Sequence, residues 1–224
     1  MRLLCISDIH GNLDALQAVL ATAEKRSFNK LLVAGDVVFP GLTDASRAKP
    51  LETWRRLTSA GAIIVQGTTD RALAMLDPES MPAKTEHEHM MVERMRAVRA
   101  ELGQLVLERL RRLPQMERIP LEDGGELILV HGAPSDFTEG MSHDLDDDEL
   151  LALVADDPAD IIVCGRTHVA FERLIGDMRI VNVGSVGEAP DSVELGAQPK
   201  VAHATWIETS PSGAVVEQIV VPLD

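Results

Sequence analysis

Short apolar runs alternate with helical patterns along the first third of the chain. Buried strands are expected at residues 2–7, 30–36 and 62–67, and helices at residues 12–25 and 46–60. Within residues 12–25, apolar side chains recur at spacings of three and four, as on one face of an α-helix. This β-α-β-α-β order predicts parallel strands joined by right-handed crossovers.

The pattern changes in the second part of the chain. A charged region at about 85–113 has the spacing of a long helix, and a short helix with an acidic start is expected within 144–157. Further strands are predicted at 117–121, 126–130, 159–165, 170–175, 178–183, 201–208 and 213–221. Because no internal repeat or clear linker interrupts the chain, we expect one domain over residues 1–224, with a helical cap or insert at about 71–115.

Composition and charge restrict the partners of this chain. Apolar residues make up 45% of the sequence and aromatic residues only 3%, so aliphatic side chains must fill the core. The formal net charge of −15 argues against an extended nucleic-acid surface, which needs Lys and Arg to replace counterions. An anionic substrate is still compatible with this charge where a bound cation supplies positive charge locally.

Two further features indicate a cytoplasmic protein with no membrane partner. No run approaches the roughly 18 apolar residues of a membrane span, and the apolar stretch at the N-terminus is too short for a signal peptide. Cys5 and Cys164 each lie in an apolar, strand-like run, which favours buried thiols over a disulfide framework.

Polar residues with metal-binding or catalytic chemistry directly follow five of the predicted strands. Ligands of open α/β sheets bind at the carboxyl ends of the strands, so these residues are expected at one edge. They are Asp8 and His10, then Asp36, then Thr68 and Thr69, then His131, then Arg166 and His168. Packing alone does not readily explain five such coincidences.

The first of these stretches, SDIHGN at residues 7–12, has two interpretations. Residues i and i+2 of an extended segment point to the same side, so Asp8 and His10 can offer an oxygen and a nitrogen to one metal ion. The same stretch also fits a simple turn in which the Asp caps the following helix.

In order along the chain, the motifs resemble those of the calcineurin-like metallophosphoesterase superfamily, and in particular its small bacterial predicted phosphodiesterases. The matching stretches are DIH (8–10), GD (35–36), GTTD (67–70), HG (131–132), GRTH (165–168) and VNVGSVGE (181–188). This resemblance covers most of the chain. It implies an α/β fold, a four-layer αββα sandwich with mixed sheets, and two metal ions bridged by a carboxylate.

The resemblance also implies the metal ligands. The first metal would take Asp8, His10, Asp36 and His168. The second would share Asp36 and take His131, but the family's other two ligands there, an Asn and a His, are replaced by Thr68 and Arg166. Arginine has no acceptor atom and stays protonated, so it cannot bind a metal and its charge repels a dication. We therefore expect one tight divalent metal (Mn, Fe, Zn or Ni) and a weak or absent second one at Thr68 and His131.

The resemblance implies a metal-dependent phosphoesterase that hydrolyses a small phosphodiester or phosphomonoester with metal-activated water. Asp36, His131 and Arg166 are the expected catalytic residues, with Arg166 and Thr69 contacting the substrate. The guanidinium of Arg166 either clamps a phosphate by a bidentate contact or swings to solvent. His131 acts either as a metal ligand or as a hydrogen-bonding group for the phosphate.

The departures at Thr68 and Arg166 also allow a second function: a catalytically weak or inactive phosphoesterase-like protein that binds a phosphate ligand or a protein partner. For the first function the expected partner is a small phosphorylated substrate. A homo-oligomer is compatible with the sequence, which does not identify the substrate.

Overall fold

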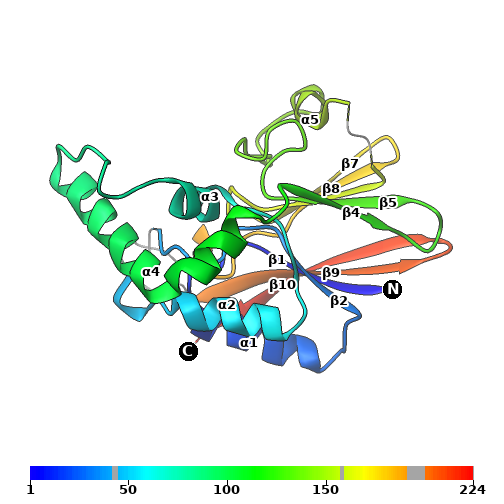
Figure 1. The fold of residues 1–224 in the computed structure, drawn as a ribbon. Helices are drawn as coiled ribbons and strands as arrows, with labels where there is room; N and C mark the ends of the chain where they lie inside the picture. Colours follow the sequence, from blue (N-terminus) through cyan, green and yellow to red (C-terminus); the bar gives the residue numbers. More distant parts are fainter. Residues whose placement is uncertain (42–44, 157–158, 191–199, 224) are drawn as a thin grey trace.

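Two five-stranded sheets pack face to face in the computed structural model, which describes residues 1–41, 45–156, 159–190 and 200–223 (Figure 1). The first sheet has the order β10-β9-β1-β2-β3. Its members are β1 (Arg2–Ile6), β2 (Lys30–Val33), β3 (Ile63–Ile64), β9 (Val201–Ser210) and β10 (Gly213–Pro222). Strands β1, β2 and β3 are parallel, and the long β9–β10 hairpin adds to β1 in the antiparallel sense.

The second sheet has the order β4-β5-β6-β8-β7. Its members are β4 (Met116–Pro120), β5 (Glu126–Val130), β6 (Ile161–Cys164), β7 (Phe171–Ile175) and β8 (Met178–Asn182). The three central strands are parallel, and the edge strands β4 and β7 are antiparallel to their neighbours. Both sheets are therefore mixed.

Helices cover the outer faces of both sheets. Beside the first sheet lie α1 (Leu13–Glu24), α2 (Pro50–Ser59), α3 (Thr68–Met75) and α4 (Glu86–Arg111), and a 3₁₀ helix spans Ala45–Arg47. The second sheet is covered by α5 (Asp147–Val154) and the loops around it (Figure 1). The predicted four-layer αββα sandwich is confirmed.

The layers follow from the alternation of side chains along each strand. In β1, Leu3 and Cys5 pack between the two sheets, whereas Leu4 and Ile6 pack against the helices of the first sheet. Successive residues of a strand face opposite sides, and a continuous apolar run is the pattern of a strand buried on both faces. The sequence RLLCIS at residues 2–7 thus encodes a central strand.

Polar caps fix where the helices begin. The Asn12 side chain accepts a hydrogen bond from the Ala15 amide at 3.1 Å and starts α1 directly after the SDIHG stretch. Helix α4 begins with a capping box between Thr85 and Glu88. It is interrupted at Gly103, whose φ of 71° and ψ of 167° break the helical backbone.

Several elements differ from the sequence-based expectation, and the helix expected at 46–60 is instead a 3₁₀ helix at Ala45–Arg47 followed by α2 at Pro50–Ser59. The short helix α3 was not predicted as a separate element, because eight residues that directly follow a strand carry little helical periodicity. Strands β2 and β3 are shorter than expected, since the chain leaves the sheet to form the loops around the site. Residue 157, at the end of the helix expected over 144–157, lies outside the described residues. The single domain and the cap at 71–115 stay predictions.

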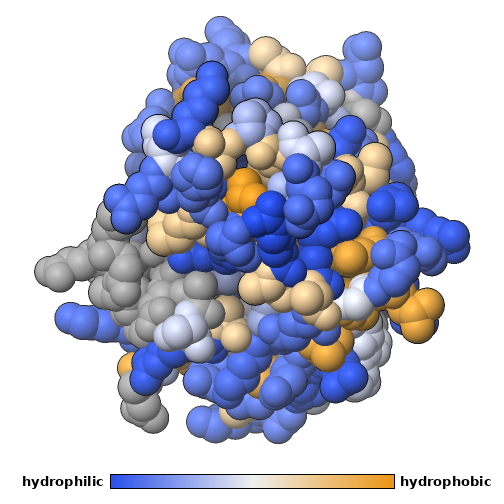
Figure 2. Space-filling view, turned by 60° about the vertical axis from the view of Figure 1, so that its left-hand side comes forward, coloured by the Kyte–Doolittle hydropathy of each residue, from blue (hydrophilic) through white to orange (hydrophobic). Residues whose placement is uncertain are grey.

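The surface on the α3–α4 side is largely hydrophilic, with apolar residues in small, separate areas (Figure 2). Within the part of the chain that the structure describes, no helix has both the length and the apolar character to cross a membrane.

Candidate metal centre

The structure brings the predicted site residues together at the carboxyl ends of parallel strands of both sheets. Backbone hydrogen bonds connect the loops that carry them: the Asp8 amide donates to the Gly35 carbonyl, the His10 amide to the Asp36 carbonyl, and the Gly165 amide to the His131 carbonyl. Among the described residues this gives two groups of potential ligands, and within each group the ligand atoms lie within 4.8 Å of one another.

The first group is formed by Asp8, His10 and His168. The Nε2 atoms of the two imidazoles are 3.3 Å apart, and the Oδ1 atom of Asp8 lies 3.2 Å from His168 Nε2 and 3.7 Å from His10 Nε2. His168 follows His10 by 158 positions in the sequence, yet the side chains of Asp8, His10 and His168 direct three ligand atoms at one point. The two side chains converge as the metal interpretation requires, but not through the extended backbone expected from the sequence, since φ is 53° at Asp8 and 52° at His10; the helix cap is Asn12.

The opposite nitrogen of each imidazole is held by a backbone carbonyl. His10 Nδ1 is 2.8 Å from the Phe39 oxygen, His168 Nδ1 is 3.2 Å from the Glu188 oxygen, and His131 Nδ1 is 2.7 Å from the Ala34 oxygen. A carbonyl can only accept, so Nδ1 carries the hydrogen and Nε2 offers its lone pair in the neutral ring. Metal-binding histidines are oriented in this way.

The second group is formed by Asp8, Asp36 and His131. His131 Nε2 lies 3.4 Å from Asp36 Oδ2, and the Thr68 hydroxyl lies 3.2 Å from the same nitrogen and 3.4 Å from the same oxygen. The carboxylate common to both groups is Asp8. That Asp36 bridges two metals stays a prediction.

Charge shifts the titration of these buried groups. Although burial by itself raises the pKa of Asp36, the charge of His131 lowers it to about 2. Burial by itself lowers the pKa of His131, but the charge of Asp36 raises it to about 9. Burial by itself lowers the pKa of His10, but the nearby Asp8 carboxylate and the charge of Glu188 raise it to about 10. The carboxylates thus attract cations, and a proton and a metal ion compete for the same nitrogen atoms.

The backbone of the site is strained. Among the described residues, seven other than glycine have positive φ, and five of these carry the site: Asp8 (53°), His10 (52°), Asp36 (50°), Arg166 (71°) and His168 (63°). Such a conformation costs on the order of 1–3 kcal/mol per residue and persists where the surrounding structure enforces it, typically at functional sites.

Two glycines allow the loops to approach this closely. A Cβ atom at Gly35, where φ is +87°, would lie 2.7 Å from the Gly67 backbone and 2.9 Å from His131 Nδ1. At Gly67 it would lie 2.1 Å from the amide nitrogen and Oδ1 atom of Asp36. Both positions therefore require the absence of a side chain.

The donor set fits a divalent cation. The Oδ1 atom of Asp8 is fully buried and has no hydrogen-bond partner in the described part of the chain, which is costly for a carboxylate oxygen unless a cation or proton approaches it. Imidazole nitrogen atoms together with carboxylate oxygen atoms suit Mn, Fe, Zn and similar metals.

Arg166 and Thr69 lie beside these groups. The Arg166 amide donates to Asp8 Oδ2 at 3.0 Å, and its exposed side chain donates from Nε to the Thr138 carbonyl at 3.2 Å. The Thr69 amide donates to Asp36 Oδ1 at 2.8 Å, and the Thr69 hydroxyl is buried with no partner among the described residues. The backbone of both residues thus orients the carboxylates.

Glu188 is a site residue that sequence reasoning missed. Its side chain is 2% exposed, and its Oε2 atom lies 3.8 Å from His10 Nε2 and 4.0 Å from His168 Nδ1. It belongs to the VNVGSVGE stretch, whose Ser185 hydroxyl donates to the Asp8 carbonyl at 2.8 Å. A Glu that ends a glycine-rich loop was the only signal in the sequence.

Comparison with known proteins gives the same family as the motifs. The model of the calcineurin-like phosphoesterase superfamily domain matches residues 1–202. The hypothetical protein PH1004 from Pyrococcus horikoshii OT3 is 20% identical, with a TM-score of 0.76 over 100% of this chain and 88% of that chain. A metallophosphoesterase from Sphaerobacter thermophilus is 22% identical, with a TM-score of 0.72 over 100% and 89%.

YfcE, a phosphoesterase from E. coli, is 20% identical, with a TM-score of 0.51 over 99% of this chain and 100% of that chain. At these identities the solved structures establish a shared fold. No curated protein sequence matches significantly. Since the family model spans most of the sequence, the predicted family is confirmed: the chain belongs to the calcineurin-like phosphoesterase superfamily.

Proposed function

We propose that this protein is a metal-dependent phosphoric ester hydrolase that cleaves a small phosphodiester or phosphomonoester with metal-activated water. The observation that supports it most is the convergence of Asp8, His10 and His168 on one point, with both Nε2 lone pairs directed inward. Packing requires no such arrangement of buried, strained polar residues.

We assign the tight metal to Asp8, His10, Asp36 and His168. A second metal at His131, Asp36 and Thr68 is weak or absent, because Thr68 offers a neutral hydroxyl where a stronger ligand is usual, and Arg166 brings a positive charge. Mn, Fe, Zn and Ni all suit these ligands. When bound, the cation supplies Lewis acidity and lowers the pKa of water towards 7.

The protein's own residues bind and orient the reactants. Asp36, fixed by the Thr69 amide, accepts a hydrogen bond from the attacking water and orients it. His131, held through Nδ1 by the Ala34 carbonyl, either ligates the second cation or donates from Nε2 to a phosphoryl oxygen. Its raised pKa of about 9 favours the protonated, donating form.

Arg166 is proposed to hold the substrate. Its Nε atom donates to the Thr138 carbonyl, and within the described ranges no partner is recorded for its two terminal nitrogen atoms, which we assign to a phosphate. A guanidinium can thereby supply part of the charge that a second cation supplies elsewhere. The Thr69 hydroxyl, buried and without a partner among the described residues, is the proposed donor to another substrate oxygen.

An activity screen tests this proposal. Bis(p-nitrophenyl) phosphate and p-nitrophenyl phosphate are incubated with the protein and Mn, Fe, Zn or Ni, and metal per chain is counted by elemental analysis. We expect turnover that Asp36→Ala lowers by about 10³-fold or more, the scale seen when one strong electrostatic group is removed. His143→Ala is the matched control, because the His143 side chain is exposed and pairs only with Asp144 among the described residues, and the substitution keeps the carbonyl that accepts from Arg173. Unchanged turnover in Asp36→Ala contradicts the mechanism.

The second candidate function is a weak or inactive phosphoesterase that binds a phosphate ligand or a protein partner. The observation that favours it is the combination of Thr68 and Arg166 at ligand positions. Absence of bound metal and of turnover across all four ions would support this alternative. We further propose a cytoplasmic location, since Cys5 and Cys164 are both buried free thiols.

A further inference from the structure

The Glu188 carboxylate is held beside the candidate cation site by a specific contact. Its Oε1 atom accepts a hydrogen bond from the Gly41 amide at 3.0 Å, and its Oε2 atom points to His10 Nε2 at 3.8 Å. A Cβ atom at Gly41 would lie 3.2 Å from both carboxylate oxygens, so the glycine permits this close approach. Glu188 lies outside the two ligand groups, and thus acts next to the ligands.

The loop of residues 39–41 connects this carboxylate with a ligand. Phe39 contributes the carbonyl that fixes His10 Nδ1 at 2.8 Å, and Gly41, two residues later, contributes the amide that holds Glu188. The position of the loop therefore sets the position of an imidazole and of a carboxylate together.

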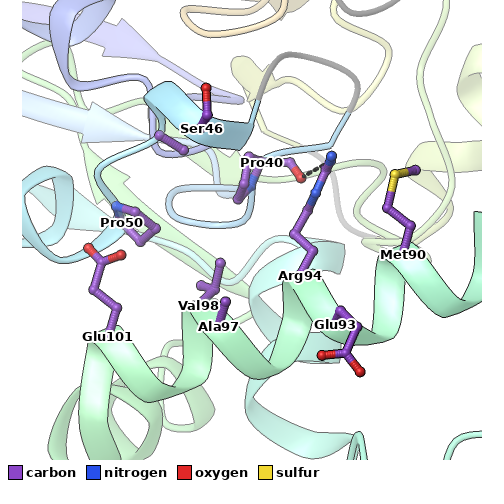
Figure 3. Close-up of a pocket in the computed structure, with 10 residues that line it drawn as sticks. Pro40, Ser46, Pro50, Met90, Glu93, Arg94, Ala97, Val98 and Glu101 are labelled. Atoms are coloured by element: carbon purple, nitrogen blue, oxygen red, sulfur yellow. Dashed lines mark hydrogen bonds between the residues drawn. The ribbon is translucent and has the colours of Figure 1, made fainter.

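Arg94 connects this loop to helix α4 by hydrogen bonds. Its Nη1 atom donates to the Pro40 carbonyl at 3.1 Å and to the Gly41 carbonyl at 2.7 Å. Figure 3 shows the Arg94 side chain rising from α4 towards Pro40, across a cavity of about 360 Å³ that Val98 and Pro50 also line. Shortening Arg94 would remove both of these hydrogen bonds to the loop.

We propose that Glu188 is a positioning residue of the cation site, held in place by the loop that Arg94 fastens to α4. Its negative charge strengthens cation binding by His10 and His168, and its backbone carbonyl fixes the His168 ring. Partners of metal-binding histidines typically contribute 10- to 100-fold to metal affinity. This inference rests on the proposed metal site.

Calorimetric titration of the full-length protein with Mn²⁺ tests the role of Glu188. Glu188→Gln keeps the size of the side chain and an acceptor for the Gly41 amide but removes the charge. We expect the dissociation constant to rise by about 10-fold or more, because the variant removes a unit negative charge beside the bound cation. The electronic absorption spectrum of the Co²⁺-loaded protein, which reports ligand geometry, should change as well. Glu188→Asp keeps the charge and should recover part of the affinity. Circular dichroism and the melting temperature of the metal-free variants establish that they fold.

Arg94→Ala tests the loop from outside the site. We expect a 3- to 30-fold loss of Mn²⁺ affinity. In the double variant with Glu188→Gln, the loss of affinity should be smaller than the product of the two single effects, because both residues act through one loop. Arg96→Ala is the matched control: it lies two residues along α4 and pairs with Glu79 and Glu93 at the surface. Its affinity should equal that of the wild type.

The outcomes separate this inference from the proposed function. Wild-type Mn²⁺ affinity in Glu188→Gln overturns the inference even where the enzyme is active. Weaker binding in Glu188→Gln without any phosphoesterase turnover supports the inference and contradicts the proposed function. A wild-type protein that binds none of the four metals overturns both.

Discussion

Asp8→Asn is the most direct test of the metal centre. Asp8 is fully buried and is the one carboxylate common to both ligand groups. Asn has the same shape and can still accept the hydrogen bond that the Arg166 amide donates to Oδ2 at 3.0 Å. The substitution therefore removes a charge and leaves the packing and the acceptor in place.

The expected magnitude follows from that charge. Two unit charges about 4 Å apart interact by roughly 4 kcal/mol at an effective dielectric constant of 20, and a dication doubles this value. The amide oxygen of Asn offsets part of the loss. A net loss of about 4 kcal/mol corresponds to about 10³-fold weaker binding of a divalent cation.

Titration with Mn²⁺ and thermal unfolding measure this effect independently. At a metal concentration of about 100 times the dissociation constant, binding stabilises the folded wild type by about 2.7 kcal/mol. For a chain of this size, that is about 5–11 °C in melting temperature. In Asp8→Asn the shift should vanish at the same concentration. Asp14→Asn, which removes one exposed charge in the first turn of α1, should keep the full shift. Wild-type affinity in Asp8→Asn would falsify the assignment of this carboxylate as a ligand.

Three more predictions concern the same edge of the sheets. Burial, and to a smaller extent the charge of Asp36, raise the pKa of Asp70 from 3.8 to about 7. The folded protein therefore keeps a proton on Asp70 that the unfolded chain loses above about pH 4. The free energy of unfolding, measured by urea titration without metal, should therefore decrease as the pH rises from 5 to 7, by at most about 1.4 kcal/mol per pH unit. Asp70→Asn should not show this decrease. If both proteins show the same pH dependence, the prediction is wrong. Thr68→Asn combined with Arg166→His should raise the Mn²⁺ count from one to two per chain by elemental analysis, whereas an unchanged count means that other features exclude the second ion. Gly35→Ala should lower the free energy of unfolding by about 2–5 kcal/mol, because φ is positive there and the added Cβ atom would overlap with backbone and imidazole atoms. In the control Gly176→Ala, where φ is +60° and the space for a Cβ atom is open, the free energy of unfolding should fall by only about 1–2 kcal/mol.

Local patterns in the sequence were sufficient for most of the fold. The apolar run at 2–7 and the helical spacing at 12–25 gave β1 and α1 nearly to the residue, because both periods are properties of neighbouring residues. The motifs were sufficient to predict the family, which the match over residues 1–202 confirms. The short helix α3 was missed, since one strand end and eight residues hold too few periodic positions.

The positions of Asp8, His10 and His168 at strand ends could be predicted, but their distances could not. A parallel sheet fixes which loops share an edge. How close two side chains come depends on loop conformation, here on positive φ values and on glycines at positions 35 and 67.

The sequence alone determined most of the strands and helices, though not α3, and the oxygen and nitrogen donors of the two ligand groups, because these depend on local spacing and residue chemistry. Only the tertiary structure decided that Asp8 is a member of both ligand groups and that Glu188 lies beside His10, held by the loop to which Arg94 is hydrogen-bonded. Most of these contacts join residues 53 to 178 positions apart in the sequence, so they arise from the packing of the whole chain, and no local pattern encodes them.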